Sequence, residues 1–147
     1  MRSIVRSILG VVLGFFAASV VMMIVEWTNT HVLYPEIGKL AEGVTDREQF
    51  RAIMASAPVG VFLVVILGWV LGSTAGGFLA TWIGKKPPYR HAVILGVLLT
   101  IAGILVNLKM PPPAWFWIAT LLVFIPSACA GARLAPRAIA QLHKFPA

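Results

Sequence analysis

Four long apolar runs dominate the pattern of hydrophobic and polar positions along the chain. Apolar runs of about 18 residues or more are long enough to cross a bilayer as helices, and in lipid every backbone polar group must be satisfied internally. We therefore predict an all-α fold, a four-helix transmembrane bundle in which residues 1–147 form a single integral membrane domain. The expected spans lie at about residues 7–27, 57–83, 92–108 and 114–132.

A polar segment at residues 28–56 separates the first two runs, and we expect it to form one outer loop that contains short helices. The first short helix corresponds to "PEIGKLAEG", which begins with Pro35 and ends at Gly43. Proline is favoured at the first position of a helix, and glycine is favoured just after its end. The loop is therefore predicted to be structured.

The second short helix is predicted from "TDREQFRAIM", in which Thr45 and Glu48 have the spacing of a capping box. This pattern predicts an amphipathic helix that lies on the outer surface. Two interpretations stay open: a helix packed on its own bundle, and a helix that binds a partner. Its apolar residues recur at helical spacing and are Phe50, Ile53, Met54 and Ala57.

Composition supports the membrane interpretation. Hydrophobic residues make up 59% of the chain and charged residues 12%, which is about half the charged share of a soluble domain. The net charge of +7 does not indicate nucleic-acid binding, because the basic residues flank the apolar runs and do not cluster with aromatic residues. The lipid bilayer is the expected partner, and no nucleic acid is expected. The first run is longer than the core of a signal peptide, so we expect a retained span.

The distribution of lysine and arginine predicts that both termini are cytoplasmic. The first loop carries basic residues diluted by acidic ones, and the third loop has only Lys109. By the positive-inside rule, the loops with few or diluted positive charges lie outside. The basic residues expected on the cytoplasmic side are Arg2, Arg6, Lys85, Lys86, Arg90, Arg133, Arg137 and Lys144.

The second run carries small residues at four-residue spacing, interrupted once at Val64. Residues four apart lie on one face of a helix, and small residues let membrane helices approach closely. We therefore predict a helix-packing seam within the bundle, with a homo-oligomer interface or a pore lining as alternatives. A pore has the least support, because the pattern offers almost no polar groups to replace an ion's hydration shell. This small-residue row consists of Gly60, Gly68, Gly72, Gly76, Ala80 and Gly84.

Four polar residues are predicted to meet at the outer end of the bundle: Glu26, His31, Asn107 and Lys109. Glu26 lies 20 residues beyond Arg6, about 30 Å along a helix, which places it at the outer edge of the hydrocarbon. A carboxylate at that depth must be paired or hydrated, so we expect Lys109 or Asn107 close by. The cluster is interpreted either as a structural ion pair or as a proton or ion site.

Other kinds of chemistry have little support in the sequence. The single cysteine, Cys129, excludes an internal disulfide, and the three histidines show no metal-ligand spacing. The apolar runs contain no paired carboxylates for acid–base catalysis, no Ser/His/Asp set and no phosphate-binding loop. We therefore expect no enzyme, no cofactor and no metal.

The overall pattern resembles a family of uncharacterised small four-span bacterial integral membrane proteins with no assigned activity. The resemblance covers most of the chain, and it implies a multi-pass protein of the bacterial inner membrane. The features that carry it are Glu26 in the first run, the "LYPE" that follows, the small-residue row, and "PPPAWFWI" at the fourth run.

Two function classes remain. The first is a non-catalytic accessory or scaffold subunit of a larger membrane assembly or homo-oligomer. The second is an oligomeric small transporter or channel. A carrier needs ionisable or hydrogen-bonding groups near mid-membrane. The apolar runs offer few such groups, which favours the first class.

Overall fold

The computed structural model describes residues 2–84 and 88–142, and these residues form an all-helical fold. Within them, four helices are long and apolar enough to cross a membrane: Ile4–Leu33, Val59–Gly84, Tyr89–Lys109 and Ala114–Pro136. The predicted all-α fold is confirmed, and the four long helices have the length and composition that the prediction of four spans requires. The elements in chain order are α1 (Arg2–Thr28), the π-helical turn η1 (Asn29–Leu33), α2 (Pro35–Ala41), α3 (Arg47–Ser56), α4 (Val59–Gly84), α5 (Pro88–Lys109) and α6 (Ala114–Leu142).

The first span runs further than the apolar pattern predicts, to Leu33 instead of residue 27. Polar residues continue the helix because their side chains bond to its own backbone. The Thr30 hydroxyl, for example, donates to the carbonyl oxygen of Glu26 at 2.9 Å. A hydroxyl bonded one turn back in this way lets a polar residue remain within a helix. The predicted outer loop is correspondingly shorter at its start.

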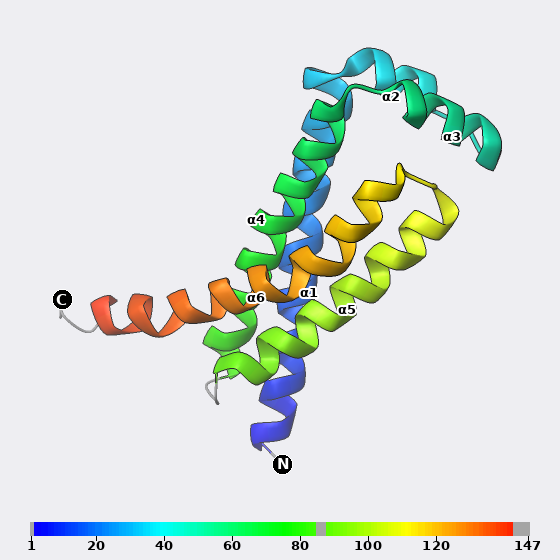
Figure 1. Cartoon of the computed structure of the whole chain (residues 1–147). Coiled ribbons are helices and arrows are strands. Elements are labelled where there is room, and N and C mark those ends of the chain that lie inside the picture. The colour runs from blue at the N-terminus through cyan, green and yellow to red at the C-terminus, as the bar shows by residue number, and fades with distance from the viewer. Residues whose placement is uncertain (1, 85–87, 143–147) are drawn as a thin grey trace.

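α4 lies at the centre of the bundle, where it packs against α1, α5 and α6. Figure 1 shows α1 and α4 side by side, with α5 and α6 forming a hairpin whose tip leans away from them. The short helices α2 and α3 project from the same end of the molecule as that tip. The long helices are therefore splayed at the end that carries α2 and α3.

α4 approaches α1 through small residues on both helices. A methyl group at Gly72 would lie 2.7 Å from the carbonyl oxygen of Ala18. A methyl group at Gly14 would lie 2.7 Å from the carbonyl oxygen of Gly76 and 2.9 Å from Cβ of Ala80. The two backbones are therefore in direct contact, and such close van der Waals packing drives helix association in lipid.

The other members of the row have different neighbours. Gly68 faces a valine side chain of α1. Gly60 faces the phenol of Tyr34, and Gly84 faces the imidazole of His91 on α5. The row therefore follows α1 along most of α4, up to Gly84, whose backbone N would lie 3.3 Å from a methyl group at Gly10. Gly60 and Gly84 also meet other elements.

A second close interface, between α4 and α6, falls outside the row. Gly77 lies against the backbone of Ala128, and Gly131 lies against the carbonyl group of Thr74. Across the same interface the Thr74 hydroxyl donates to the carbonyl oxygen of Ser127 at 3.3 Å. α4 therefore makes backbone contacts on two sides, and only one of them follows the four-residue spacing.

The start of α3 differs from the predicted capping box. Its N-cap is Asp46, whose carboxylate accepts a hydrogen bond from the backbone N–H of Gln49 at 2.8 Å. The predicted cap at Thr45, with Glu48 as its partner, is therefore wrong by one residue. Aspartate caps a helix at least as well as threonine, and here it is the residue next to the first turn.

α3 is amphipathic, as predicted, with Phe50, Ile53 and Met54 half-buried and its other residues exposed. It packs against α2, and none of its residues is buried. The expectation of a helix packed directly on its own bundle is therefore not met. The apolar side of α3 instead faces a cavity between the long helices, which Phe50 and Met54 line.

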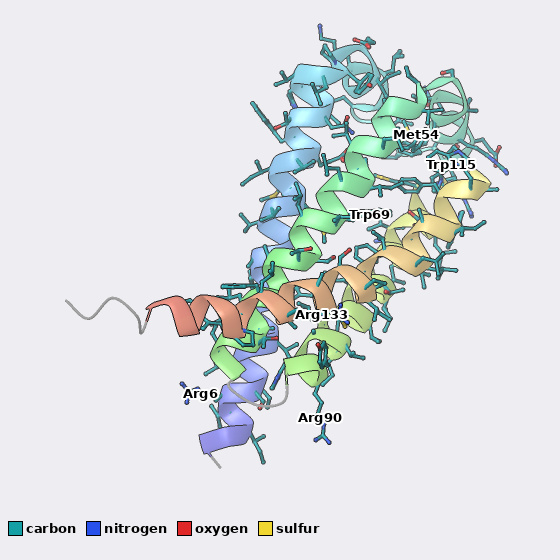
Figure 2. All side chains as sticks on the ribbon, turned by 60° about the vertical axis from the view of Figure 1, so that its left-hand side comes forward. Arg6, Met54, Trp69, Arg90, Trp115 and Arg133 are labelled. Atoms are coloured by element: carbon teal, nitrogen blue, oxygen red, sulfur yellow. The ribbon has the colours of Figure 1, made fainter. Side chains whose placement is uncertain are left out.

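Basic side chains gather at the end of the bundle opposite α3. Figure 2 shows Arg6 and Arg90 at that end and Met54 at the other. The Arg133 guanidinium donates to the Tyr89 hydroxyl at 3.3 Å and lies over the ring, 5.9 Å from its centroid. Which end is cytoplasmic stays a prediction. Part of that prediction rests on residues outside the described ones, namely Lys85, Lys86 and Lys144.

Candidate functional site

A cavity of about 760 Å³ lies beneath α2 and α3, between the α1–α4 pair and the α5–α6 hairpin. All seven helical elements contribute side chains to its wall. Three residues of the predicted polar cluster are among them, namely Glu26, His31 and Asn107. The structure therefore brings together residues from α1, η1 and α5 that are far apart in the sequence.

Glu26 reaches the cavity from the last turn of α1. Its carboxylate interacts with the side chain of Asn29, one turn further along the chain. Asn29 is fully buried, and its Nδ2 donates to the carbonyl oxygen of Val61 at 3.1 Å. This bond ties the end of α1 to the start of α4, so the neighbour of Glu26 is itself held in place.

His31 lies in the π-helical turn and is positioned by Trp27. The two rings are stacked, with centroids 5.0 Å apart and planes at 13°. The Nδ1 atom of His31 lies 3.0 Å from the carbonyl oxygen of Trp27 and 2.9 Å from Oγ1 of Thr30. The other ring nitrogen, Nε2, is therefore the one that can meet a ligand, and π-helical turns often occur at functional sites.

Asn107 is buried at the end of α5 and bonded to α6. Its Nδ2 donates to the hydroxyl oxygen of Thr120 at 2.7 Å, and that hydroxyl donates to the carbonyl oxygen of Phe116 at 2.9 Å. The chain of two bonds fixes the orientation of the Asn107 side chain. Asn107 is among the residues that line the cavity.

Lys109 does not join the cluster. It is exposed and does not line the cavity. Asn107 faces α6, and a residue two positions further along an α-helix points about 200° away. In the described part of the chain, no basic nitrogen lies within 4.0 Å of the Glu26 carboxylate. The predicted ion pair between Glu26 and Lys109 is therefore not formed.

The cation on the cavity wall is instead Lys39 of α2, accompanied by Glu42. Neither residue belongs to the predicted polar cluster. Their three-residue spacing places them on one face of the predicted helix. That spacing does not indicate whether this face is directed toward the cavity or toward solvent. Its direction depends on how α2 crosses the splayed end of the bundle.

The remaining wall is aromatic and rich in methionine. Figure 2 shows Trp69 between α4 and α6. Its ring centroid lies 4.8 Å from that of Phe116 and 5.1 Å from that of Phe124, and Phe62 lies 5.4 Å from Phe116. Every methionine after Met1 lines the cavity, namely Met22, Met23, Met54 and Met110.

The described residues contain no group of three or more histidine, cysteine, aspartate or glutamate side chains that could hold a metal ion. No family model, curated protein or solved structure matches the chain. The feature that bears on function is an apolar cavity at one end of a helical bundle, with ionisable groups of both signs on its wall.

Proposed function

We propose that the protein is a non-catalytic multi-pass protein of the bacterial inner membrane that serves as an accessory or scaffold subunit of a larger assembly. The observation that carries the proposal is the closed middle of the bundle. There the glycines of α4 touch the backbones of α1 and α6. Two hydroxyl groups in this region donate to helix carbonyls, Thr100 to Gly96 at 2.8 Å and Thr74 to Ser127 at 3.3 Å. Such close packing favours a bundle built for helix contact over one that contains an open pathway.

The hairpin of α2 and α3 is the surface that best suits contact with a partner. It projects from the splayed end of the bundle (Figure 1). The side of α3 that faces away from the cavity is exposed and carries Arg47, Glu48 and Arg51. Charges of both signs outside the lipid favour a specific orientation of a bound protein over non-specific adhesion.

Photo-crosslinking in living cells tests the proposal. A photoreactive residue in place of Ala55, on the exposed side of α3, is expected to crosslink to one defined polypeptide. A second copy of this chain would add 15.8 kDa, and a different partner would add another mass. The matched control is the same residue in place of Leu63, which is exposed on α4 and is expected to give lipid adducts. If neither position gives an adduct with a protein, the subunit role is contradicted.

An oligomeric small transporter or channel is the second candidate, and Glu26 on the cavity wall is the observation that favours it. Carriers use intramembrane acids as ion or proton sites. This function ranks second because the lining residues of α4 stop at Trp69, and below that level Gly72 and Gly76 close against α1. A transporter requires that Glu26→Gln abolish a pH-dependent flux into proteoliposomes. A wild-type protein that supports no flux rules this candidate out.

A further inference from the structure

The cavity beneath α2 and α3 has an apolar end and a charged end. Met22 borders Gly72 in the closed part of the bundle, and Trp69 is the deepest lining residue of α4. Lys39 belongs to α2 and Glu42 directly follows that helix, which covers the opposite end. This division, along the direction of the helices, matches the division of an amphiphile into chain and headgroup.

The charged end carries both signs, and the protein does not neutralise them by ion pairing. Glu26 and Glu42 supply carboxylates, and Lys39 supplies an ammonium group. Within the described residues, none of these groups lies within 4.0 Å of an oppositely charged side chain. All three side chains are exposed, and Lys39 and Glu42 lie outside the four candidate spans. They are therefore accessible to a ligand, and a headgroup that carries both charges complements them.

We propose that the cavity binds one zwitterionic phospholipid whose headgroup carries a phosphate and a primary ammonium, as an ethanolamine headgroup does. The ammonium pairs with the Glu26 carboxylate and the phosphate pairs with Lys39. One acyl chain lies against Trp69 and the methionines. The inference goes beyond the proposed subunit function and does not depend on it.

Hydrogen bonding selects a primary ammonium over a quaternary one. The Glu26 carboxylate accepts hydrogen bonds, and so does the amide oxygen of Asn107. The amide nitrogen of Asn107 is already bonded to Thr120. A choline headgroup carries the same charges but has no N–H group to donate. A hydrogen bond to a charged group changes affinity by about tenfold or more, so the cavity discriminates between the two headgroups.

The rest of the wall suits an acyl chain. Methionine side chains are flexible and polarisable, and they adapt to apolar groups of variable shape. The volume of about 760 Å³ lies within the usual range for small-molecule sites, about 300–1,000 Å³. The cavity therefore takes the headgroup and part of one chain, while the second chain remains in the bilayer.

Native mass spectrometry of delipidated protein, titrated with defined phospholipids, tests the inference. The wild-type protein is expected to retain one phosphatidylethanolamine about tenfold more strongly than phosphatidylcholine with the same chains. Phosphatidylglycerol, which lacks the ammonium, is expected to bind most weakly. Glu26→Gln should remove the preference for ethanolamine over choline, and Lys39→Gln should weaken both. Glu36→Gln is the matched control, because Glu36 is exposed on α2 and does not line the cavity.

A second pair of variants separates the cavity from the general lipid surface. Val65→Trp fills the cavity and is expected to abolish retention of the lipid, whereas Leu63→Trp on the exposed side of α4 leaves it intact. Glycerophosphoethanolamine, the headgroup without chains, is expected not to displace the lipid at equal concentration. Equal retention of ethanolamine and choline lipids by the wild-type protein would overturn the inference. So would a preference that survives Val65→Trp, or displacement by the free headgroup.

Discussion

A methyl group at Gly72 of α4 would lie 2.7 Å from the carbonyl oxygen of Ala18 in α1. That separation is shorter than ordinary van der Waals contact between carbon and oxygen, so the interface has no room for a side chain at this position. Because lipid chains are as apolar as the helices, the association of α1 with α4 depends on this close packing and not on removal of apolar surface from water.

Gly72→Leu is therefore expected to destabilise the protein. Inserting a larger side chain into a close contact costs about 1–3 kcal/mol, and more where backbone atoms cannot move aside. Thermal unfolding in mild detergent measures the loss. Ala130→Leu is the matched control, since Ala130 is exposed on α6 and accepts a larger side chain. If the two variants unfolded at the same temperature as the wild type, the α1–α4 contact would not contribute to stability.

The hydrogen bond between Asn107 and Thr120 is expected to couple α5 to α6. Thr120→Val leaves the buried amide of Asn107 without its acceptor, and Asn107→Leu removes the donor. In a membrane such a bond contributes about 1 kcal/mol. Reversible unfolding of the two single variants and the double variant should give a coupling energy of that size. Additive losses would show that the bond makes no net contribution.

The spans and short helices could be predicted because their signals are local. The length of each apolar run determines whether it can cross a bilayer, and Pro35 marks the start of α2. The second interface of α4 could not be predicted. That helix is apolar on all sides, so hydrophobicity does not show which face is buried. Gly77 is a single glycine beside the row, and only its contact with Ala128 reveals a role.

The candidate site could be predicted in part. The depth of Glu26 and Asn107 along their helices placed them at one level, and both line the cavity. Depth along a helix does not show how the helix is rotated about its own axis, and so does not predict the direction in which each side chain points. For this reason Lys109 was predicted in the cluster although it points away, and Lys39 was missed although it lines the wall.

Asp46→Ala is expected to loosen α3 without unfolding the bundle. The carboxylate satisfies the N–H of Gln49 at 2.8 Å, and loss of an N-cap costs about 1 kcal/mol. Amide hydrogen exchange in α3 should accelerate about fivefold, while exchange in α4 stays unchanged. Thr45→Ala is the control, because Thr45 lies outside the helix. An equal acceleration in both variants would favour the capping box at Thr45.

The positive-inside prediction is testable in a background that carries Cys129→Ala. A cysteine in place of Val44, in the loop between α2 and α3, is expected to react in intact cells with a membrane-impermeant maleimide. A cysteine in place of Arg90, at the start of α5, is expected to react only after the cells are permeabilised. The reverse pattern of labelling would show that the termini lie outside.

The most direct test of the central claim, that the protein is a subunit of a larger assembly, is native mass spectrometry of the wild-type chain released from its own membrane. We expect a mass that exceeds one 15.8 kDa chain by at least one further polypeptide. Collisional activation should release that polypeptide as an intact second copy or as a distinct protein. A particle that contains one 15.8 kDa chain and only lipid would contradict the subunit role and leave the lipid site as the protein's remaining binding function.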